Sequence, residues 1–397
     1  MPPPLIAHIV YRFATGGLEN GVVNLINRLP AQSWRHAVVS LTDVDPAFAG
    51  RISRDNVRCI ALNKGPGHGL RLYPTIFRLL RELRPAIVHT RNLAALEAVV
   101  PAWIAGVAAR VHGEHGRDVG DLDGSSLRHQ RVRRLFRAFV TRYVAVSPDL
   151  ERYLHERIGV PESRIDQIYN GVDTGRFCPA PDGRAPIAGC PFQGPAYWLV
   201  GAVGRLEAVK DHANLARAFV VAVNADPEAR RRMRLVIVGN GTLKGEVEAI
   251  LASAGARDLA WFAGERADVV PVLQGLDCFV LPSLAEGVSN TILEAMACGL
   301  PVVATRVGAN TELVDEDVTG RTVPAADNEA LARAIGAYFT APGLSRDHGQ
   351  AARRRVERKF NLDRMVENYH RLYSDLLAGR ARPIEASDRA LRHRGNR

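Results

Sequence analysis

The feature that most constrains the fold of this chain is an alternation of short apolar runs with amphipathic helical patterns, which occurs twice along the sequence. The first series of strand-like runs covers 6–13, 36–42, 57–63, 86–92, 109–116 and 142–147, and the second covers 197–204, 234–241, 259–264, 277–283 and 301–308. Parallel strands need crossover connections, which are usually helices, so the alternation predicts parallel sheets with helices on both faces. The expected fold class is α/β, with two Rossmann-like parallel-sheet domains.

A Pro/Gly-rich stretch separates the two series. Residues 174–196 hold five prolines and four glycines, a composition typical of a linker or an irregular surface excursion. The predicted domains are therefore 1–175 and 196–360, joined by a linker at 176–195. A last helical pattern at 361–378 precedes a basic tail, 379–397, which lacks apolar periodicity and is predicted to be disordered.

Composition excludes several classes of protein. The chain has 397 residues, 47% of them apolar and 24% charged, which excludes disorder throughout. The net charge of +10 is concentrated partly in 128–142, with six arginines and no acid, and partly in the tail. A positive field attracts nucleotides, nucleic acids or anionic lipid headgroups. Aromatic residues are few, so a stacking surface for single-stranded nucleic acid is disfavoured and no nucleic-acid partner is expected.

The sequence also predicts the compartment. Five scattered cysteines without a CxxC pair suggest buried thiols in a reducing cytoplasm. The N-terminus lacks the pattern of a signal peptide. The longest apolar stretch, 98–109, is too short to span a bilayer. We therefore expect a cytoplasmic protein, with peripheral contact to the inner face of the plasma membrane left open.

Candidate ligand-binding residues follow the strands of the second series. Ligands of open parallel sheets bind at the carboxyl ends of strands, and two facing sheets would form a central cleft. Gly204 ends one strand, and Arg205 and Lys210 follow it, two cations suited to a diphosphate. The alternative is a solvated loop with two surface cations.

A second loop of this kind contains Gly239 and Gly241, directly before a helical pattern. Glycines at this place allow a ligand to approach the backbone, and helix amides favour anions. A lone GxG also occurs in ordinary tight turns. It supports a ligand-binding site here only because similar loops follow the neighbouring strands.

The stretch 286–294, EGVSNTILE, is more specific. Asn290 is predicted to cap a helix whose first amides face a phosphate, with Glu294 one turn in and Glu286 before the helix. A carboxylate can accept both hydroxyls of a ribose, as in dinucleotide sites, and the other can accept hydroxyls of a second sugar. The alternative is one helix with a solvated charge.

These motifs together resemble the retaining glycosyltransferases of family 4, which have the GT-B fold. The resemblance rests on EGVSNTILE at 286–294, GRLEAVKD at 204–211, NGVD at 170–173 and VAVS at 144–147, and covers about residues 5–375. The N-terminal segments look most similar to sugar transferases of exopolysaccharide and PEP-CTERM systems. The resemblance implies that the final helix, 361–378, crosses back to the first domain.

The resemblance also implies roles for the residues. Arg205 and Lys210 would neutralise the donor diphosphate, Glu294 would bind the ribose, and Glu286 would contact the donor sugar as a positioning residue without forming a covalent intermediate. Further contacts to the donor are implied for Gly287, Val288, Ser289, Asn290, Gly16 and Gly17. His115 matches the histidine that lies beside the reacting sugar, although Gly116 follows it where many relatives have aspartate.

The implied reaction moves a hexose-type sugar from a UDP- or GDP-sugar to a hydroxyl of a lipid-linked or growing glycan, with no cofactor. Two alternatives stay open: a nucleotide-sugar 2-epimerase of the same fold, and a non-catalytic nucleotide-sugar-binding partner.

Several patterns suggest sites less strongly. Asp43-Val-Asp45 and Asp121-Leu-Asp123 have the DxD form that binds metal in other glycosyltransferases, but they are interpreted as solvated loops, and no metal is expected. The segment 128–142 places Val132, Leu135, Phe136, Phe139 and Val140 at helical spacing, with arginines around them. It is either a helix packed on the sheet or a surface helix that contacts anionic lipid.

Overall fold

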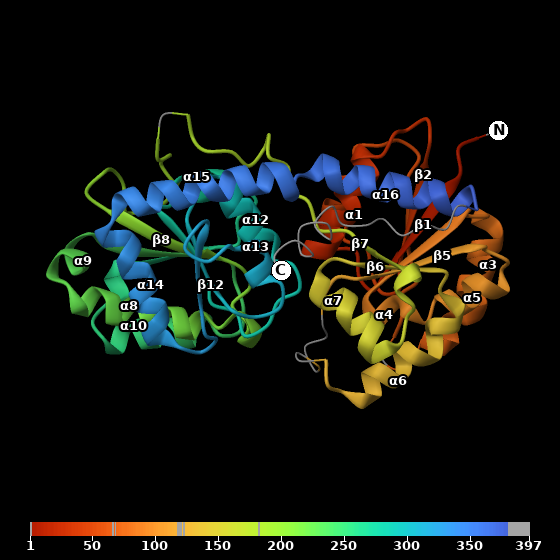
Figure 1. Cartoon of the computed structure of the whole chain (residues 1–397), viewed down its shortest axis with the longest axis horizontal. Helices are drawn as coiled ribbons and strands as arrows, with labels where there is room; N and C mark the ends of the chain where they lie inside the picture. The colour runs from red at the N-terminus through yellow and green to blue at the C-terminus, as the bar shows by residue number, and fades with distance from the viewer. Residues whose placement is uncertain are drawn as a thin grey trace, which may run out of the picture. The chain divides into compact units, whose positions relative to one another are not determined.

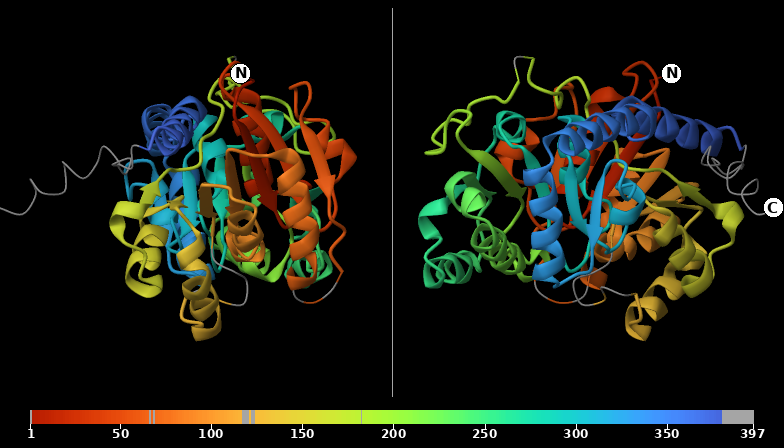
Figure 2. Two further views of the ribbon diagram at one scale, coloured as in Figure 1. Left: turned by 90° about the vertical axis from the view of Figure 1, so that its right-hand side faces the viewer. Right: turned by 60° about the vertical axis from the view of Figure 1, so that its left-hand side comes forward.

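The computed structural model describes residues 2–65, 67, 69–116, 121, 124–181 and 183–379. The chain divides into two compact units, one formed by 1–170 with 362–397 and the other by 171–361. Each unit contains one parallel sheet with helices on both faces (Figure 1), and two further directions show the same layering (Figure 2). This confirms the predicted α/β class.

The first unit has a seven-stranded parallel sheet in the order β3-β2-β1-β4-β5-β6-β7. Its strands are β1 Leu5–Val10, β2 Arg35–Ser40, β3 Arg58–Ala61, β4 Ile87–Arg91, β5 Ala109–Glu114, β6 Arg142–Ala145 and β7 Ile165–Gln167. Its α-helices are α1 Gly17–Arg28, α2 Pro46–Ala49, α3 Tyr73–Leu83, α4 Asn92–Leu96, α5 Val99–Ile104, α6 Leu127–Phe136, α7 Pro148–Arg152 and α16 Leu362–Leu377. Short helical turns cover Gly69–Leu72, Arg137–Phe139, Tyr153–Ile158 and Glu162–Arg164.

The last helix of the first unit packs on its sheet. α16 contributes Met365, Tyr369 and Tyr373 to a core cluster with Ile6 and Ile87 of the central strands. The Trp34 indole donates to His370 Nδ1 at 2.8 Å, which fixes the same helix at β2. The apolar face of the pattern at 361–378 therefore completes the core of the first unit.

The second unit has a six-stranded parallel sheet in the order β10-β9-β8-β11-β12-β13. Its strands are β8 Trp198–Val203, β9 Met233–Val238, β10 Ala260–Gly264, β11 Cys278–Leu281, β12 Val302–Thr305 and β13 Gly320–Val323. Its α-helices are α8 His212–Ala225, α9 Pro227–Arg232, α10 Lys244–Ser253, α11 Val269–Gln274, α12 Asn290–Ala297, α13 Asn310–Leu313, α14 Asn328–Thr340 and α15 Pro342–Lys359. Short helical turns cover Ala208–Lys210 and Arg257–Leu259.

The Pro/Gly-rich segment is fastened to the second unit by side chains. Arg353 of α15 donates to the carbonyl oxygens of Thr174 at 3.0 Å, Phe177 at 2.7 Å and Ala297 at 2.6 Å, so it joins the segment to the end of α12. Arg184 pairs with Asp277 beside β11 at 2.6 Å. The backbone at Thr174, Phe177 and Arg184 is therefore held in place although the composition of this segment is that of a loop.

Both sheets reverse their strand order at the same place. In each unit the first strand is central, the next two strands extend the sheet on one side, and the fourth strand pairs with the first on its other side. The switch points thus lie between β1 and β4 and between β8 and β11. Ligands of doubly wound sheets bind beyond the carboxyl ends of the strands at such points.

Candidate active-site residues

The switch point of the second unit brings the predicted residues of two loops together. The loop after β8 contains Arg205 and Lys210, and the loop after β11 contains Glu286. A backbone hydrogen bond from Leu284 N to Val209 O, 2.8 Å long, joins the two loops. Parallel neighbours end at one edge of a sheet, so this convergence follows from the topology.

Lys210 and Glu286 form an ion pair at the centre of this switch point. Lys210 Nζ donates to Glu286 Oε1 at 2.5 Å, and their side chains are 21% and 10% exposed. Ser283 Oγ donates to the same carboxylate oxygen at 2.6 Å. The sequence predicted both residues for the site, but not that each is the other's partner. The pair holds a mostly buried cation at the end of β8 and balances its charge.

Arg205 differs from Lys210 in its surroundings. It is exposed, and among the residues that the structure describes it forms no ion pair or side-chain hydrogen bond. Its neighbour Leu206 is buried in the core and fixes the backbone of the loop. Arg205 therefore offers an open guanidinium, which can fork onto two oxygens of a ligand.

Gly239 and Gly241 shape this loop by close packing. Gly239 has φ +131°, and a Cβ there would collide with the carbonyl oxygen of Gly204. A Cβ on Gly241 would collide with the backbone of Leu206. The close approach that the structure records is thus between two loops of the protein, while contact of these glycines with a donor stays a prediction.

The cap of α12 differs from the prediction. Ser289 is the N-cap, with its hydroxyl accepting from Ile292 N at 3.4 Å, and Asn290 is the first helical residue. The prediction of Asn290 as N-cap was wrong because Ser289 has the extended backbone of a cap, φ −76° and ψ 111°. Ser289 and Val288 are buried, whereas Glu294, one turn into the helix, is half-buried.

A third loop closes around this one. Gly308, after β12, has φ +52°, and a Cβ there would collide with the carbonyl oxygen of Glu286. Ala309 N donates to Gly287 O at 3.1 Å, and Thr305 Oγ1 donates to Ser283 O at 2.6 Å. The backbone that carries Glu286 and Gly287 is therefore fixed from a neighbouring strand.

Sequence reasoning missed His212, which lies beside the ion pair. Its ring is buried, and burial together with the nearby Lys210 cation lowers its pKa to about 4. The imidazole is thus neutral at physiological pH, and it packs near Gly204 at the end of β8. A histidine directly after the cationic loop, at the start of α8, was the available signal.

The remaining predicted site residues belong to the first unit. Gly16 and Gly17 start α1, which has no side-chain cap. His115 follows β5, and Asn92 Oδ1 accepts from its backbone N–H at 2.8 Å. Both ring nitrogens of His115 are buried without a hydrogen-bond partner among the described residues. Burial first, and then the Arg91 cation, lower the pKa of His115 to about 3.

The aspartate pairs are used within the protein. Asp43 pairs with Arg12 at 2.9 Å, and Asp45 caps α2. Asp121 is buried and accepts from Ser126 N at 2.7 Å, so its interpretation as a solvated residue was wrong, while Asp123 lies outside the described residues. Within the described part of the chain, no group of three or more His, Cys, Asp or Glu residues is arranged to hold a metal ion.

The arginine-rich segment 128–142 divides between two environments. Arg133 is buried and donates to both carboxylate oxygens of Glu114, at 2.6 and 3.2 Å. Leu135, predicted for the apolar face, is 68% exposed. The other predicted apolar residues, Val132, Phe136, Phe139 and Val140, are buried or partly buried, so the prediction fails at Leu135. Arg133 is turned inward because Glu114 supplies a buried counter-charge. No helix within the described residues is long and apolar enough to cross a membrane, and the basic tail beyond Gly379 lies outside them.

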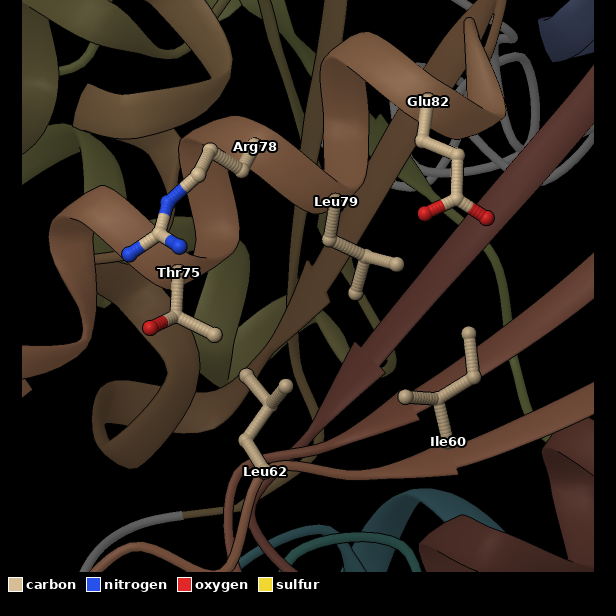
Figure 3. Close-up of a pocket in the computed structure, with 6 residues that line it drawn as sticks. All are labelled: Ile60, Leu62, Thr75, Arg78, Leu79 and Glu82. Atoms are coloured by element: carbon tan, nitrogen blue, oxygen red, sulfur yellow. The ribbon is translucent and has the colours of Figure 1, made fainter.

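One surface pocket lies apart from all these residues. It is lined by Ile60 and Leu62 at the edge strand β3 and by Thr75, Arg78, Leu79 and Glu82 of α3 (Figure 3). None of the predicted site residues lines it, and its strand is the outermost of the first sheet. The pocket is therefore not the candidate site.

Two family profiles match the chain, one in each half. Residues 15–176 match the profile described as Glycosyltransferase Family 4, and residues 198–340 match that of glycosyl transferases group 1. The second match includes the ion pair of Lys210 with Glu286 and the start of α12. The chain belongs to the family 4 glycosyltransferases.

Curated relatives of this glycosyltransferase include a lipopolysaccharide core biosynthesis mannosyltransferase, LpcC, of Rhizobium leguminosarum bv. viciae, 34% identical over 53% of this chain and 59% of its own length. A UDP-Gal:alpha-D-GlcNAc-diphosphoundecaprenol alpha-1,3-galactosyltransferase of Escherichia coli is 25% identical over 77% of this chain and 79% of its own length. The chain thus spans less than two thirds of the first relative and more of the second.

Comparison with solved structures identifies the fold. HepE of Anabaena, in complex with UDP and glucose, superimposes with a TM-score of 0.78 at 19% identity, over 94% of this chain and 100% of that one. At this identity the likeness concerns the fold alone, which is GT-B, as the sequence predicted.

Proposed function

We propose that this glycosyltransferase moves a hexose-type sugar from a nucleotide diphosphate sugar to a hydroxyl acceptor in the synthesis of a cell-surface polysaccharide. The observation that carries the proposal is the ion pair of Lys210 with Glu286 at 2.5 Å, at the switch point of the second unit and beside the start of α12. The names of the curated relatives, a mannosyltransferase and a galactosyltransferase, support a hexose and a cell-surface glycan.

The leaving group explains why cations are needed. A nucleoside diphosphate leaves with negative charge, which fixed cations and helix amides stabilise. Lys210 and the exposed Arg205 supply the cations, and the first amides of α12 supply the dipole end. When a donor binds, its phosphates compete with Glu286 for Lys210, and the freed carboxylate of Glu286 can accept hydroxyls of the sugar.

Retention is part of the proposal and follows from the resemblance to family 4. The anomeric carbon becomes oxocarbenium-like, and the departing phosphate assists deprotonation of the acceptor on the same face. Glu286 is then a positioning residue, which agrees with its two hydrogen-bonding partners, Lys210 and Ser283. Detection of a glycosyl ester on Glu286 by mass spectrometry of the intact protein would contradict this role.

The donor is a UDP- or GDP-sugar. A UDP complex of a structural neighbour, HepE, favours testing UDP first. Glu294, half-buried one turn into α12, is proposed to bind the ribose, with Gly287, Val288 and Asn290 near the sugar and phosphates.

The decisive experiment is calorimetric titration of UDP, GDP and their sugars into the wild type and Lys210→Ala. One diphosphate sugar should bind the wild type, and the variant should bind it at least tenfold more weakly, since a charge-assisted contact is lost. Glu246→Gln in α10 is a control, because Glu246 is exposed and, among the described residues, its ion pair is with Arg217, at 3.9 Å. Absence of binding by folded wild type at millimolar ligand would favour the non-catalytic alternative, and donor turnover without an acceptor would favour a 2-epimerase.

The acceptor is proposed to be lipid-linked or a growing glycan, reached at an anionic membrane surface. Arg128 and Arg131 of α6 are exposed, as are Leu127, at 62%, and Leu135 of the same helix. Exposed apolar side chains beside arginines favour an anionic lipid surface. Flotation with phosphatidylglycerol vesicles at low salt should recover the wild type and lose it in R128Q/R131Q; equal recovery of both would contradict a role of this helix.

A further inference from the structure

Among the described residues of the first unit, three arginines are buried, and two of these have an acidic partner. Arg133 forks onto Glu114 at 2.6 and 3.2 Å, and Arg142 forks onto Asp166 at 2.9 and 3.2 Å. Arg91, 3% exposed, forms no ion pair with any carboxylate of the described residues. Burying a charge without a counter-ion costs free energy, so the burial of Arg91 without a carboxylate partner calls for an explanation.

The position of Arg91 at the end of a strand suggests that its counter-ion is a bound ligand. It is the last residue of β4, the strand that pairs with β1 at the switch point of the first unit. Its guanidinium makes two long contacts, both 3.4 Å, to the carbonyl oxygen and Nδ1 of His89, and it also hydrogen-bonds the Tyr373 hydroxyl. Contacts of this length are near the limit for a hydrogen bond, so the guanidinium keeps most of its capacity to donate.

His89 is oriented as a donor toward the same edge. Arginine can only donate, so its contact makes His89 Nδ1 an acceptor, and the Tyr373 hydroxyl, 2.7 Å from Nδ1, donates to it as well. The remaining proton is then on His89 Nε2, which is buried and has no partner among the described residues. The site thus contains an N–H without a partner among the described residues, on the same ring whose Nδ1 contacts Arg91.

His115 adds a second imidazole at the same point. A Cβ on Gly113 would lie 2.8 Å from His115 Nε2 and 3.1 Å from His89 Nε2, so both nitrogens face the same side of this glycine. Both nitrogens of His115 lack partners among the described residues. The Asn92 side chain holds the His115 backbone at the strand end.

We infer that Arg91, His89 and His115 form an oxyanion-binding subsite at the β1–β4 switch point of the first unit. Its ligand is a phosphate-type group, which takes the place of the missing carboxylate on Arg91 and accepts from the two imidazoles. Within the proposed function, on which this inference rests for its biological ligand, the group is carried either by the acceptor or by the donor diphosphate.

The test uses inorganic phosphate and sulfate as probes, titrated into the full chain at constant ionic strength. Arg91→Gln removes the cation at nearly constant size. Arg81→Gln is the matched control, because Arg81 is an exposed arginine of the same unit, in α3. The wild type and Arg81→Gln should bind both anions equally, and Arg91→Gln should bind them about tenfold or more weakly, the loss expected for one charge-assisted contact.

Further measurements separate the possible outcomes. If uridine diphosphate competes with sulfate in the wild type, the donor carries the phosphate-type group; if it does not, the acceptor carries it.

His115→Gln gives a second variant should Arg91→Gln fail to fold by circular dichroism, and it should also weaken sulfate binding. In crystals soaked with selenate, the anomalous peak should lie within hydrogen-bond distance of Arg91.

The inference is overturned if the wild type binds neither anion, if Arg91→Gln binds them as the wild type does, or if selenate is found elsewhere as an adventitious ion only. This result is distinct from failure of the proposed function, because loss of nucleotide-sugar binding in Lys210→Ala is measured independently in the second unit.

Discussion

The two switch points of this chain share a strand order but differ in how they balance charge. In the second unit, Lys210 is paired with Glu286. In the first unit, Arg91 pairs with no carboxylate among the described residues; its guanidinium contacts His89 and the Tyr373 hydroxyl, and its charge acts on the nearby His115. The same topology can therefore present two kinds of cation. A ligand of Lys210 would compete with the Glu286 carboxylate, whereas a ligand of Arg91 would compete with no carboxylate of the described residues.

The two units also differ in how many buried histidines they contain. The largest effect that we predict is therefore a difference in how strongly acid destabilises each unit. Burial lowers the pKa of four histidines of the first unit, His8, His36, His89 and His115, and of two in the second, His212 and His348. The unfolded chain binds protons near pH 6.5, whereas the native rings stay neutral to much lower pH. Stability is therefore lost as the pH falls below about 6.5, by up to about 1.4 kcal/mol per pH unit and histidine.

The first unit should accordingly lose protection before the second between pH 7 and pH 5. Hydrogen exchange followed by mass spectrometry, corrected for the intrinsic rate at each pH, measures both units in one sample. His36→Gln should reduce the pH dependence of the first unit, because one titrating ring is removed. Equal loss in the two units would contradict the comparison.

A second prediction concerns the paired cation. Lys210→Met should lower kcat/KM of glycosyl transfer by about 10²–10³-fold, the range seen when one donor of a charge-stabilising site is removed. Arg205→Met should cost less, since its exposed charge is partly screened by solvent. The two variants, assayed side by side with one donor, test whether the buried cation contributes more to kcat/KM than the exposed one. A larger loss for Arg205→Met would show that Arg205 is the more important cation.

A third prediction tests the backbone that carries Glu286. Gly308→Ala should lower the free energy of unfolding by about 1–3 kcal/mol, because its Cβ would collide with the Glu286 carbonyl and its φ is +52°. Gly336→Ala in α14 is a control, since nothing lies near its Cβ and alanine favours a helix. Urea unfolding gives both values, and similar results for the two variants would contradict the packing described.

The smallest expected effect concerns the cap of α12. Ser289→Ala should lower the free energy of unfolding by about 1 kcal/mol, the usual cost of a lost N-cap. Asn290→Ala should cost less, because Asn290 is not the cap. Thermal unfolding of both variants decides between the cap that the structure shows and the one that the sequence suggested.

The sequence predicted the fold well because strand–helix alternation has few solutions. Glu286 and Lys210 could be placed at one edge of a sheet from the residues alone, since each follows a strand. Their direct contact could not, because it depends on how two loops 76 residues apart fold against each other. Arg91 was overlooked although a charge at the end of the buried run 86–92 was visible. Its meaning depends on the absence of a carboxylate, which only the folded neighbourhood reveals.

The glycines and the arginine-rich helix teach the same lesson. Gly239 and Gly241 were assigned to ligand approach, which stays a prediction; the close contacts that the structure adds are with Gly204 and Leu206. Arg133 was counted only in the charge of the segment 128–142, and its burial depends on Glu114, 19 residues away, as its partner. Residue type and spacing limit what a side chain can do, while its neighbour decides what it does.

The three carbonyl oxygens held by Arg353 have a mechanical consequence. One guanidinium binds the segment at Thr174 and Phe177 and also the last turn of α12 at Ala297. Tension applied to the chain at this segment would be transmitted through that side chain to the helix that carries Glu294. Arg353 thus couples the backbone of this segment to the helix that carries Glu294, the residue proposed to bind the ribose.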